Sequence, residues 1–285
     1  GRAAFHALVA SAHGLITNLR PRAIKKLGLT YDSLKAHNPR LVCVALTGYG
    51  LEGPYADRPA YDYVIQAMTG IMQMTGDPDA EPAKAGYSAV DNSAGIMAAL
   101  ALVAKLAEGK GGQVDVAMYD VILSQLNYVV AAWLNAGEQP QRHARSAHPF
   151  IVPAQVFPTR EGWLMLFITH DEFWRRFCEE VDRRDWLSDA RFASIEGRRE
   201  NRALVIESLT DILKTDTAAR WAARLAPRGI VAAAVDTLDN ALASDLTRAR
   251  DMVVTLEGGG VRAAGNPIKL PGVEPEYRAP PVLGE

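Results

Sequence analysis

The segment Leu41-Val42-Cys43-Val44-Ala45-Leu46 is an uninterrupted apolar run with the length of a β-strand. Such runs are typical of strands that are buried on both faces of a parallel sheet. The run ends in Thr47-Gly48-Tyr49-Gly50-Leu51-Glu52-Gly53-Pro54-Tyr55, where three glycines and a proline predict turns and a close backbone approach. We therefore expect an α/β fold in which this strand is buried inside a parallel sheet.

The segments on either side of this strand alternate between short strands and apolar-faced helices, as an α/β fold requires. Upstream, the patterns predict a helix over 3–12, a short strand at 15–16 and a helix over 23–27. Downstream, they predict a helix over 61–74, a long apolar helix from 91 to about 109, a strand over 114–118 and a helix over 120–133.

The pattern changes after a polar segment at 135–147 that is rich in Gln, Arg and His and looks like a linker. Two strands, 150–157 and 163–168, flank a turn and precede predicted helices over 171–182, 200–214 and 217–226 and a strand over 231–235. Strands flanking helices in this way predict a second, smaller α+β domain. The proline-containing tail is expected to be extended and irregular.

Composition excludes some classes of function. The chain has 285 residues, of which 48% are apolar and 22% charged, and its formal net charge is −2. These values are ordinary for a globular protein and provide no strong field for nucleic acid or an anionic membrane. No apolar run approaches the roughly 20 residues of a membrane span. We therefore expect neither nucleic acid nor membrane as a partner.

Cys43 and Cys178 are far apart in the sequence and have no metal-ligand spacing. We interpret them as buried free thiols in a reducing compartment, which favours a cytoplasmic location. There is no phosphate-binding P-loop, no HExxH, no GxSxG and no His/Cys cluster, so we expect no metal.

Asp91 is the strongest candidate for chemistry. It lies within Gly86-Tyr87-Ser88-Ala89-Val90-Asp91-Asn92-Ser93-Ala94-Gly95, at the start of the long apolar helix. Asp is a favoured N-cap residue, so the position alone predicts an ordinary cap. The position also suits a nucleophile, because a helix N-terminus would lower the pKa of the carboxyl and nearby backbone N–H groups could bind an oxyanion.

A series of short motifs runs in order through nearly the whole chain. The motifs are Asn18-Leu19-Arg20-Pro21, Lys26-Leu27-Gly28-Leu29, Asn38-Pro39-Arg40-Leu41, the loop at 48–55, Ala60-Tyr61-Asp62, the Asp91 segment, Gly112-Gln113-Val114-Asp115-Val116, His148-Pro149, Phe157-Pro158-Thr159 and Gly265-Asn266-Pro267-Ile268-Lys269. Each motif alone is weak. The ordered set resembles the family III CoA-transferases (CaiB/BaiF type), which include formyl-CoA:oxalate and carnitine CoA-transferases and the alpha-methylacyl-CoA racemases.

The resemblance implies a Rossmann-like large domain that binds CoA, a smaller α+β domain and an interlocked homodimer. The expected divisions are 1–134 for the large domain, 135–149 for the linker, 150–235 for the small domain and 236–285 for a C-terminal segment that returns to the large domain. The resemblance also implies that this chain lacks the family's first strand and helix units, which carry part of the CoA site. We therefore expect a chain truncated at its N-terminus.

The resemblance further implies a reaction. Asp91 matches the catalytic aspartate, which forms an anhydride with the acyl group of an acyl-CoA and then an aspartyl-CoA thioester, before a small carboxylic acid accepts the CoA. The positions that match the binding site for the CoA nucleotide, phosphates and pantetheine are Asn18, Leu19, Arg20, Lys26, Pro59, Ala60, Tyr61 and Asp62. Arg and Lys suit this role because they pair strongly with phosphate.

Tyr61 distinguishes between two reactions within this family. The racemases pair their aspartate with a histidine, and Tyr61 stands at the position that matches this histidine. An ordinary tyrosine is a poor base at neutral pH, which favours transfer over movement of an alpha proton. Three hypotheses remain: a CoA-transferase with a donor such as succinyl-CoA, a 2-methylacyl-CoA racemase, and a CoA-binding chain without catalysis.

Overall fold

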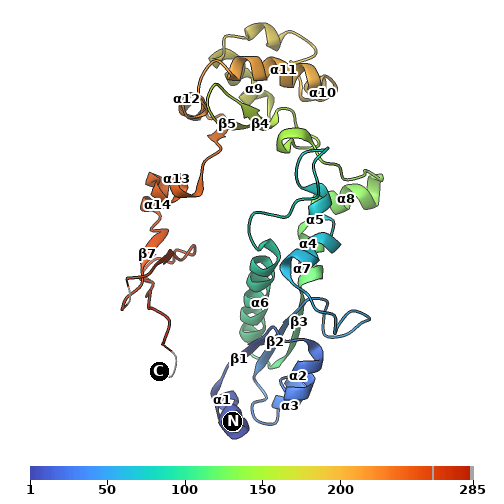
Figure 1. The fold of residues 1–285 in the computed structure, drawn as a ribbon, viewed down its shortest axis with the longest axis vertical. Helices are drawn as coiled ribbons and strands as arrows, with labels where there is room; N and C mark the ends of the chain where they lie inside the picture. The colour runs from blue at the N-terminus through green and yellow to red at the C-terminus, as the bar shows by residue number, and fades with distance from the viewer. Residues whose placement is uncertain (259, 283–285) are drawn as a thin grey trace. The chain divides into compact units, whose positions relative to one another are not determined.

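The computed structural model describes residues 1–258 and 260–282 and divides the chain into two compact units, Gly1–Pro149 and Phe150–Glu285 (Figure 1). The boundary lies at the end of the segment expected to be a linker. The separation of 236–285 from the small domain, and the roles expected for each part, stay predictions.

The first unit is built on a parallel sheet with the strand order β1-β2-β3, where β1 is Gly14–Thr17, β2 is Val42–Thr47 and β3 is Gly112–Ala117. Its helices are α1 (Arg2–Ser11), α2 (Pro21–Leu27), α3 (Tyr31–Leu34), α4 (Asp62–Met68), α5 (Ile71–Met74), α6 (Ala89–Ala107), α7 (Met118–Gln125) and α8 (Asn127–Ala136), with a 3-10 turn at Ala144–Ser146. A parallel sheet with its helices confirms the α/β fold class.

The central strand β2 is buried on both faces, as its sequence predicts. Val42 and Val44 pack on one side in a cluster with residues of α4, α6 and α7. Leu41 and Cys43 pack on the other side with residues of α1 and α3. Successive side chains of a strand point to opposite faces, so an unbroken apolar run supplies both layers at once.

Several helix boundaries differ from the prediction. The helix expected over 61–74 is divided into α4 and α5, because Gly70 between them has a φ of 85°. The helix expected over 120–133 is divided into α7 and α8, and α7 begins two residues before Asp120. Asp120, expected as the first residue of this helix, therefore lies in the first turn of α7, whose N-cap residue is Ala117.

The second unit contains an antiparallel sheet with the order β4-β5-β6, formed by Ala154–Pro158, Trp163–Phe167 and Val231–Ala234. Its helices are α9 (Asp171–Glu180), α10 (Ile195–Glu200), α11 (Arg202–Leu213) and α12 (Ala218–Leu225), with 3-10 turns at Arg184–Leu187 and Ala226–Arg228. The sheet and helices confirm the predicted α+β character. The first strand begins at Ala154 and not at Phe150, and α10 was not predicted.

Further along this unit, the chain forms α13 (Leu238–Ala243), α14 (Asp245–Ala249) and a hairpin of β7 (Val253–Thr255) and β8 (Arg262–Ala264). These regular elements were missed in the sequence. Gly265 allows a close approach after the hairpin, because an added Cβ would meet the carbonyl oxygen of Asp251 at 2.1 Å.

Helix α6 has an unusual surface. It is 19 residues long, with a mean hydropathy of 1.4, and 17% of this stretch is buried inside the structure. By length and composition it is apolar enough to cross a membrane, which corrects the expectation that no segment approaches a span. A single helix of this kind is weak evidence for a membrane, since core helices of globular proteins share its length and composition.

Candidate functional site

Asp91 lies in the first turn of α6, as its third residue. The N-cap residue is Ser88, whose side chain makes no capping hydrogen bond. The expectation that Asp91 itself is the N-cap is therefore wrong. The Asp91 side chain is exposed, while its neighbour Val90 is buried against the sheet. The carboxylate of Asp91 therefore lies at the surface, on a helical turn that is anchored by the buried side chain of Val90.

The cap of this turn comes from another helix. One carboxylate oxygen of Asp62, in the first turn of α4, accepts hydrogen bonds from the backbone N–H groups of Val90 at 2.8 Å and Asp91 at 3.1 Å. The other oxygen accepts from the side-chain amide of Gln66 at 2.5 Å. The amide oxygen of Gln66 in turn accepts from the N–H of Ala85 at 2.9 Å. Asp62 and Gln66 are both buried.

All four backbone N–H groups in the first turn of α6 are occupied. Those of Val90 and Asp91 bind Asp62, that of Ala89 donates to the carbonyl of Tyr87, and that of Asn92 donates to the carbonyl of Ser88. These groups are not free to bind an oxyanion. The expectation that N–H groups beside Asp91 would do so is therefore wrong for this turn.

The charge environment of Asp91 also differs from the prediction. Although the Asp91 side chain is largely exposed, partial loss of hydration raises the pKa of its carboxyl above the usual value, and the negative charge of Asp62 raises it further. The sequence predicted a lowered pKa from the helix N-terminus alone. Asp62, whose negative charge opposes the effect of the helix N-terminus, lies on a separate helix. The sequence around Asp91 therefore did not reveal it. A raised pKa makes the ionised carboxylate a stronger nucleophile once it is formed.

The residues predicted to bind CoA follow the carboxyl ends of the parallel strands. Asn18, Leu19 and Arg20 come directly after β1, and the glycine-rich loop comes directly after β2. Ligands of open α/β sheets bind at this edge. The backbone N–H of Arg22 donates to the carboxylate of Asp57 at 3.0 Å, which ties the start of α2 to the segment after the loop.

Most of these predicted residues are accessible. Asn18, Leu19, Arg20, Lys26, Pro59 and Tyr61 are exposed, and Ala60 is half-buried. Tyr61 is the N-cap residue of α4 and is 77% exposed. Asp62 differs from the others, because its buried carboxylate is already bound to two backbone N–H groups and Gln66. Gln66 was missed, although a glutamine on the apolar side of a predicted helix was a signal for it.

A close backbone approach joins the glycine-rich loop to the Pro59–Asp62 segment. A Cβ added at Gly48 would lie 2.2 Å from the Cβ of Ala60, which is closer than side chains can pack. Gly48 also accepts a hydrogen bond on its carbonyl from the N–H of Tyr119 at 3.2 Å. The glycine therefore allows the loop to lie against the residues that lead into α4.

The two cysteines are buried, and neither contributes to this region. Burial raises the pKa of Cys43 to about 11 and that of Cys178 to about 12. Thiols with such values are protonated at neutral pH and are poor nucleophiles. Within residues 1–258 and 260–282, no group of three or more His, Cys, Asp or Glu side chains could hold a metal ion.

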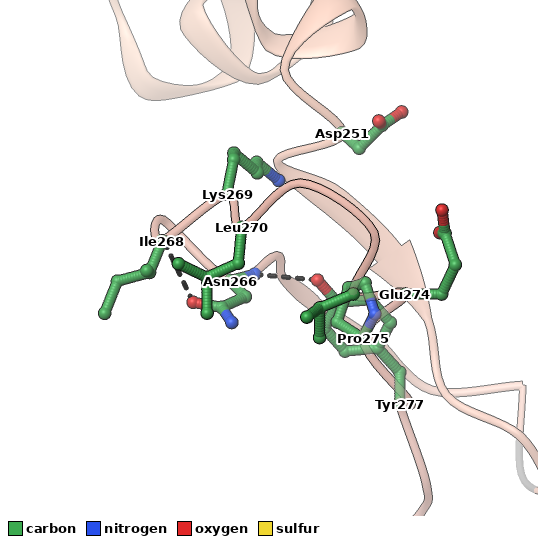
Figure 2. A pocket seen from close by; sticks show the side chains of 9 residues that line it. Asp251, Asn266, Ile268, Lys269, Leu270, Glu274, Pro275 and Tyr277 are labelled. Atoms are coloured by element: carbon green, nitrogen blue, oxygen red, sulfur yellow. Dashed lines mark hydrogen bonds between the residues drawn. The ribbon is translucent and has the colours of Figure 1, made fainter.

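A cavity of about 360 Å³ lies in the C-terminal part of the second unit. Figure 2 shows the segment Asn266–Lys269 along one side of it, facing Tyr277 and Glu274. The N–H of Asn266 donates to the hydroxyl of Tyr277 at 2.8 Å. Part of the Gly265–Lys269 motif therefore lines this cavity, and the predicted CoA-binding and catalytic residues are not among its lining residues.

Comparison with known proteins gave concordant results. A model of CoA-transferase family III matches residues 1–285. The acetyl-CoA:oxalate CoA-transferase of Acetobacter aceti is 32% identical over 286 residues, which cover 98% of this chain and 72% of that protein. The succinate–glutarate CoA-transferase of Agrobacterium fabrum is 33% identical over 298 residues, which cover 100% of this chain and 73% of that protein. A crystal structure of a CaiB/BaiF family protein from Brucella suis matches with a TM-score of 0.83 and 32% identity, over 99% of this chain and 75% of that one.

Proposed function

The chain belongs to CoA-transferase family III, and we propose on this basis that it moves CoA from an acyl-CoA to a small carboxylic acid with Asp91 as the nucleophile. Succinyl-CoA is the first donor to test, because the Agrobacterium fabrum relative is a succinate–glutarate CoA-transferase. The chemistry needs a carboxylate that acts as nucleophile and then as leaving group.

In the first half of the proposed reaction, a carboxylate oxygen of Asp91 attacks the acyl carbon of the thioester. The carbon–sulfur bond breaks, and the CoA thiolate leaves behind a mixed anhydride between the donor acid and Asp91. The thiolate then attacks the aspartyl carbonyl of this anhydride and releases the donor carboxylate. Asp91 now carries CoA as a thioester.

In the second half, the acceptor carboxylate attacks the aspartyl thioester, and the CoA thiolate leaves again. The resulting anhydride joins Asp91 to the acceptor acid. The thiolate attacks the acceptor side of this anhydride, which forms the new acyl-CoA and restores the Asp91 carboxylate. No proton or electron is gained or lost over the cycle, so the reaction requires no general base.

The observation that carries this proposal is the presentation of Asp91. Its carboxylate is exposed, while two N–H groups of its turn are held by a buried side chain. A nucleophile that is fixed through its backbone and open at its side chain loses little freedom in reaching the transition state. Its raised pKa also supports the nucleophilic strength of the ionised carboxylate.

We further propose that CoA binds over the carboxyl edge of the β1-β2-β3 sheet. The guanidinium of Arg20 and the ammonium of Lys26 would pair with its phosphates, while Pro59, Ala60 and Tyr61 would lie along the pantetheine. Arg20 directly precedes α2, and Lys26 lies in its last turn, so one short helix carries both cations. Their exposure leaves both available for a polyanion.

We also propose that the chain forms a homodimer that covers part of α6. Ile96, Leu100 and Val103 recur at helical spacing and are 69%, 59% and 62% exposed. Burying large side chains of this kind is worth about 1.5–3 kcal/mol each, which gives a second copy a driving force to bind there.

The test of the reaction is a CoA-exchange assay with succinyl-CoA and a panel of mono- and dicarboxylic acids. Asp91→Ala should lose at least about 10³-fold in kcat, since the covalent route then lacks its nucleophile. Asp120→Asn is the matched control, because Asp120 is also exposed in the first turn of a helix. Wild-type turnover by Asp91→Ala would refute the mechanism.

A further inference from the structure

The side chain of Asp62 caps the start of α6. Its side chain is 5% exposed, and the side chain of Gln66 below it is fully buried. One carboxylate oxygen of Asp62 accepts hydrogen bonds from the backbone N–H groups of Val90 and Asp91. The other oxygen accepts a hydrogen bond from the side-chain amide of Gln66. Every oxygen of this carboxylate therefore has a partner, and the partners come from two helices.

The position of the first turn of α6 depends on this contact. Ser88, the N-cap residue, offers no side-chain oxygen to the turn. Removing the Asp62 carboxylate would leave the N–H groups of Val90 and Asp91 unpaired against a buried surface, which is costly. The turn would then move toward other acceptors or solvent, and Asp91 would move with it.

The charge of Asp62 acts on Asp91 as well. Helix α6 packs against α4, α7, β2 and β3. The titratable side chains on these four elements are Cys43, Asp62, Tyr63, Asp115, Tyr119 and Asp120. Asp62 is the one whose charge raises the pKa of Asp91. Lys84, in the loop before α6, lies with its ammonium 4.7 Å from the ring centre of Tyr63.

We propose that Asp62 is a positioning residue for the transfer reaction, which holds the backbone of Asp91 in place with Gln66 as its support. Its negative charge also acts on the Asp91 carboxyl. This inference rests on the proposed role of Asp91 as the nucleophile. It assigns to Asp62 an action through Asp91 and not a contact with the pantetheine.

The two functions of Asp62 can be separated by a charge exchange within the pair. Asp62→Asn alone places an amide where the structure requires acceptors toward both α6 and Gln66, so one set of hydrogen bonds is lost. Adding Gln66→Glu restores the pattern, because the new amide then donates to the new carboxylate, whose second oxygen accepts from Ala85. The negative charge has then moved one turn along α4, away from Asp91.

The experiment measures kcat against pH for the full chain, after circular dichroism has confirmed folding. Asp62→Asn should lose about 10–100-fold in kcat, because a misplaced nucleophile loses much of its effective concentration. The double variant Asp62→Asn/Gln66→Glu should recover most of this loss. Its acidic limb should lie about half a pH unit or more below that of the wild type.

Thr217→Ala is the control, because it removes a helix cap in the second unit and should leave both kcat and the pH profile unchanged. The inference is overturned if Asp62→Asn keeps wild-type kcat, if the double variant fails to recover, or if its acidic limb does not move. If Asp62→Asn does not fold, the double variant decides alone. Its kcat should then be close to that of the wild type, and its acidic limb should be shifted to lower pH. A CoA adduct on Asp91 of the wild type shows separately whether the proposed function holds.

Discussion

The carboxylate of Asp62 accepts a hydrogen bond from the backbone N–H of Asp91 at 3.1 Å, although the two residues lie on different helices and 29 positions apart. The two acids are therefore neighbours of unequal exposure. Asp62 is buried and bonded, whereas Asp91 is open to solvent. Because its carboxylate is buried and bonded, Asp62 has a structural role. The exposed carboxylate of Asp91 is available to a substrate.

The pH dependence of transfer should reflect the environment of Asp91. Partial loss of hydration, and then the charge of Asp62, raise the pKa of Asp91. The reaction needs the ionised form, so kcat should fall as the pH decreases through this raised value. The limb should lie above the value of about 3.9 for a free aspartate. Rates of CoA exchange over about pH 4 to 8 measure it, and an acidic limb at or below the ordinary value would contradict the expectation.

Lys26 and its neighbour Lys25 provide a matched test of CoA binding. Both are exposed in the last turn of α2, and we propose a contact with CoA for Lys26 alone. Lys26→Ala and Arg20→Ala should each raise KM for the acyl-CoA about tenfold with little change in kcat, since a charge-assisted hydrogen bond to phosphate is lost. Lys25→Ala should leave KM near the wild-type value. Equal effects of Lys25→Ala and Lys26→Ala would contradict this placement of the phosphates.

The approach between Gly48 and Ala60 predicts a pair of compensating substitutions. Gly48→Ala would place a methyl group 2.2 Å from the Cβ of Ala60, and should lower the free energy of unfolding by about 1–3 kcal/mol. Combining it with Ala60→Gly removes the clashing atom, and the next atom, the Cα of Ala60, is 3.7 Å away. Urea unfolding should therefore show partial recovery in the double variant. A fully stable Gly48→Ala variant would show that the two segments are not packed in this way.

The exposed face of α6 predicts a concentration-dependent dimer. Leu100→Glu should convert the protein to a monomer in light scattering, because a carboxylate replaces a side chain that the second copy would bury. Gln139→Glu adds the same charge at an exposed position away from this helix and should leave the dimer intact. A wild-type protein that remains monomeric at micromolar concentrations would contradict the proposal.

Much of the fold was readable from local patterns. The apolar run at 41–46 correctly predicted a strand buried on two faces, and the ordered motifs correctly predicted the family and its enzyme class. The breaks inside the predicted helices were harder to see. Gly70 has a left-handed φ that a glycine tolerates at little cost, and a glycine within a helical pattern does not by itself mark a break.

The candidate site was only partly predictable, for a physical reason. Asp91 became the candidate nucleophile from its place at the start of an apolar helix and from the family motifs, but its partner Asp62 lies on another helix. The pairing arises from tertiary packing of α4 on α6, which no sequence window contains. For the same reason, the sequence predicted a lowered pKa and free N–H groups beside Asp91. The structure has a raised pKa and occupied N–H groups.

The most direct measurement of the central claim is peptide mass spectrometry after incubation with succinyl-CoA. Trypsin should release residues 85–105, a peptide in which Asp91 is the only acidic side chain. We predict that this peptide carries CoA as a thioester and that hydroxylamine converts it to the hydroxamate. Unmodified peptide during active turnover, or CoA attached to any other part of the chain, would contradict the account.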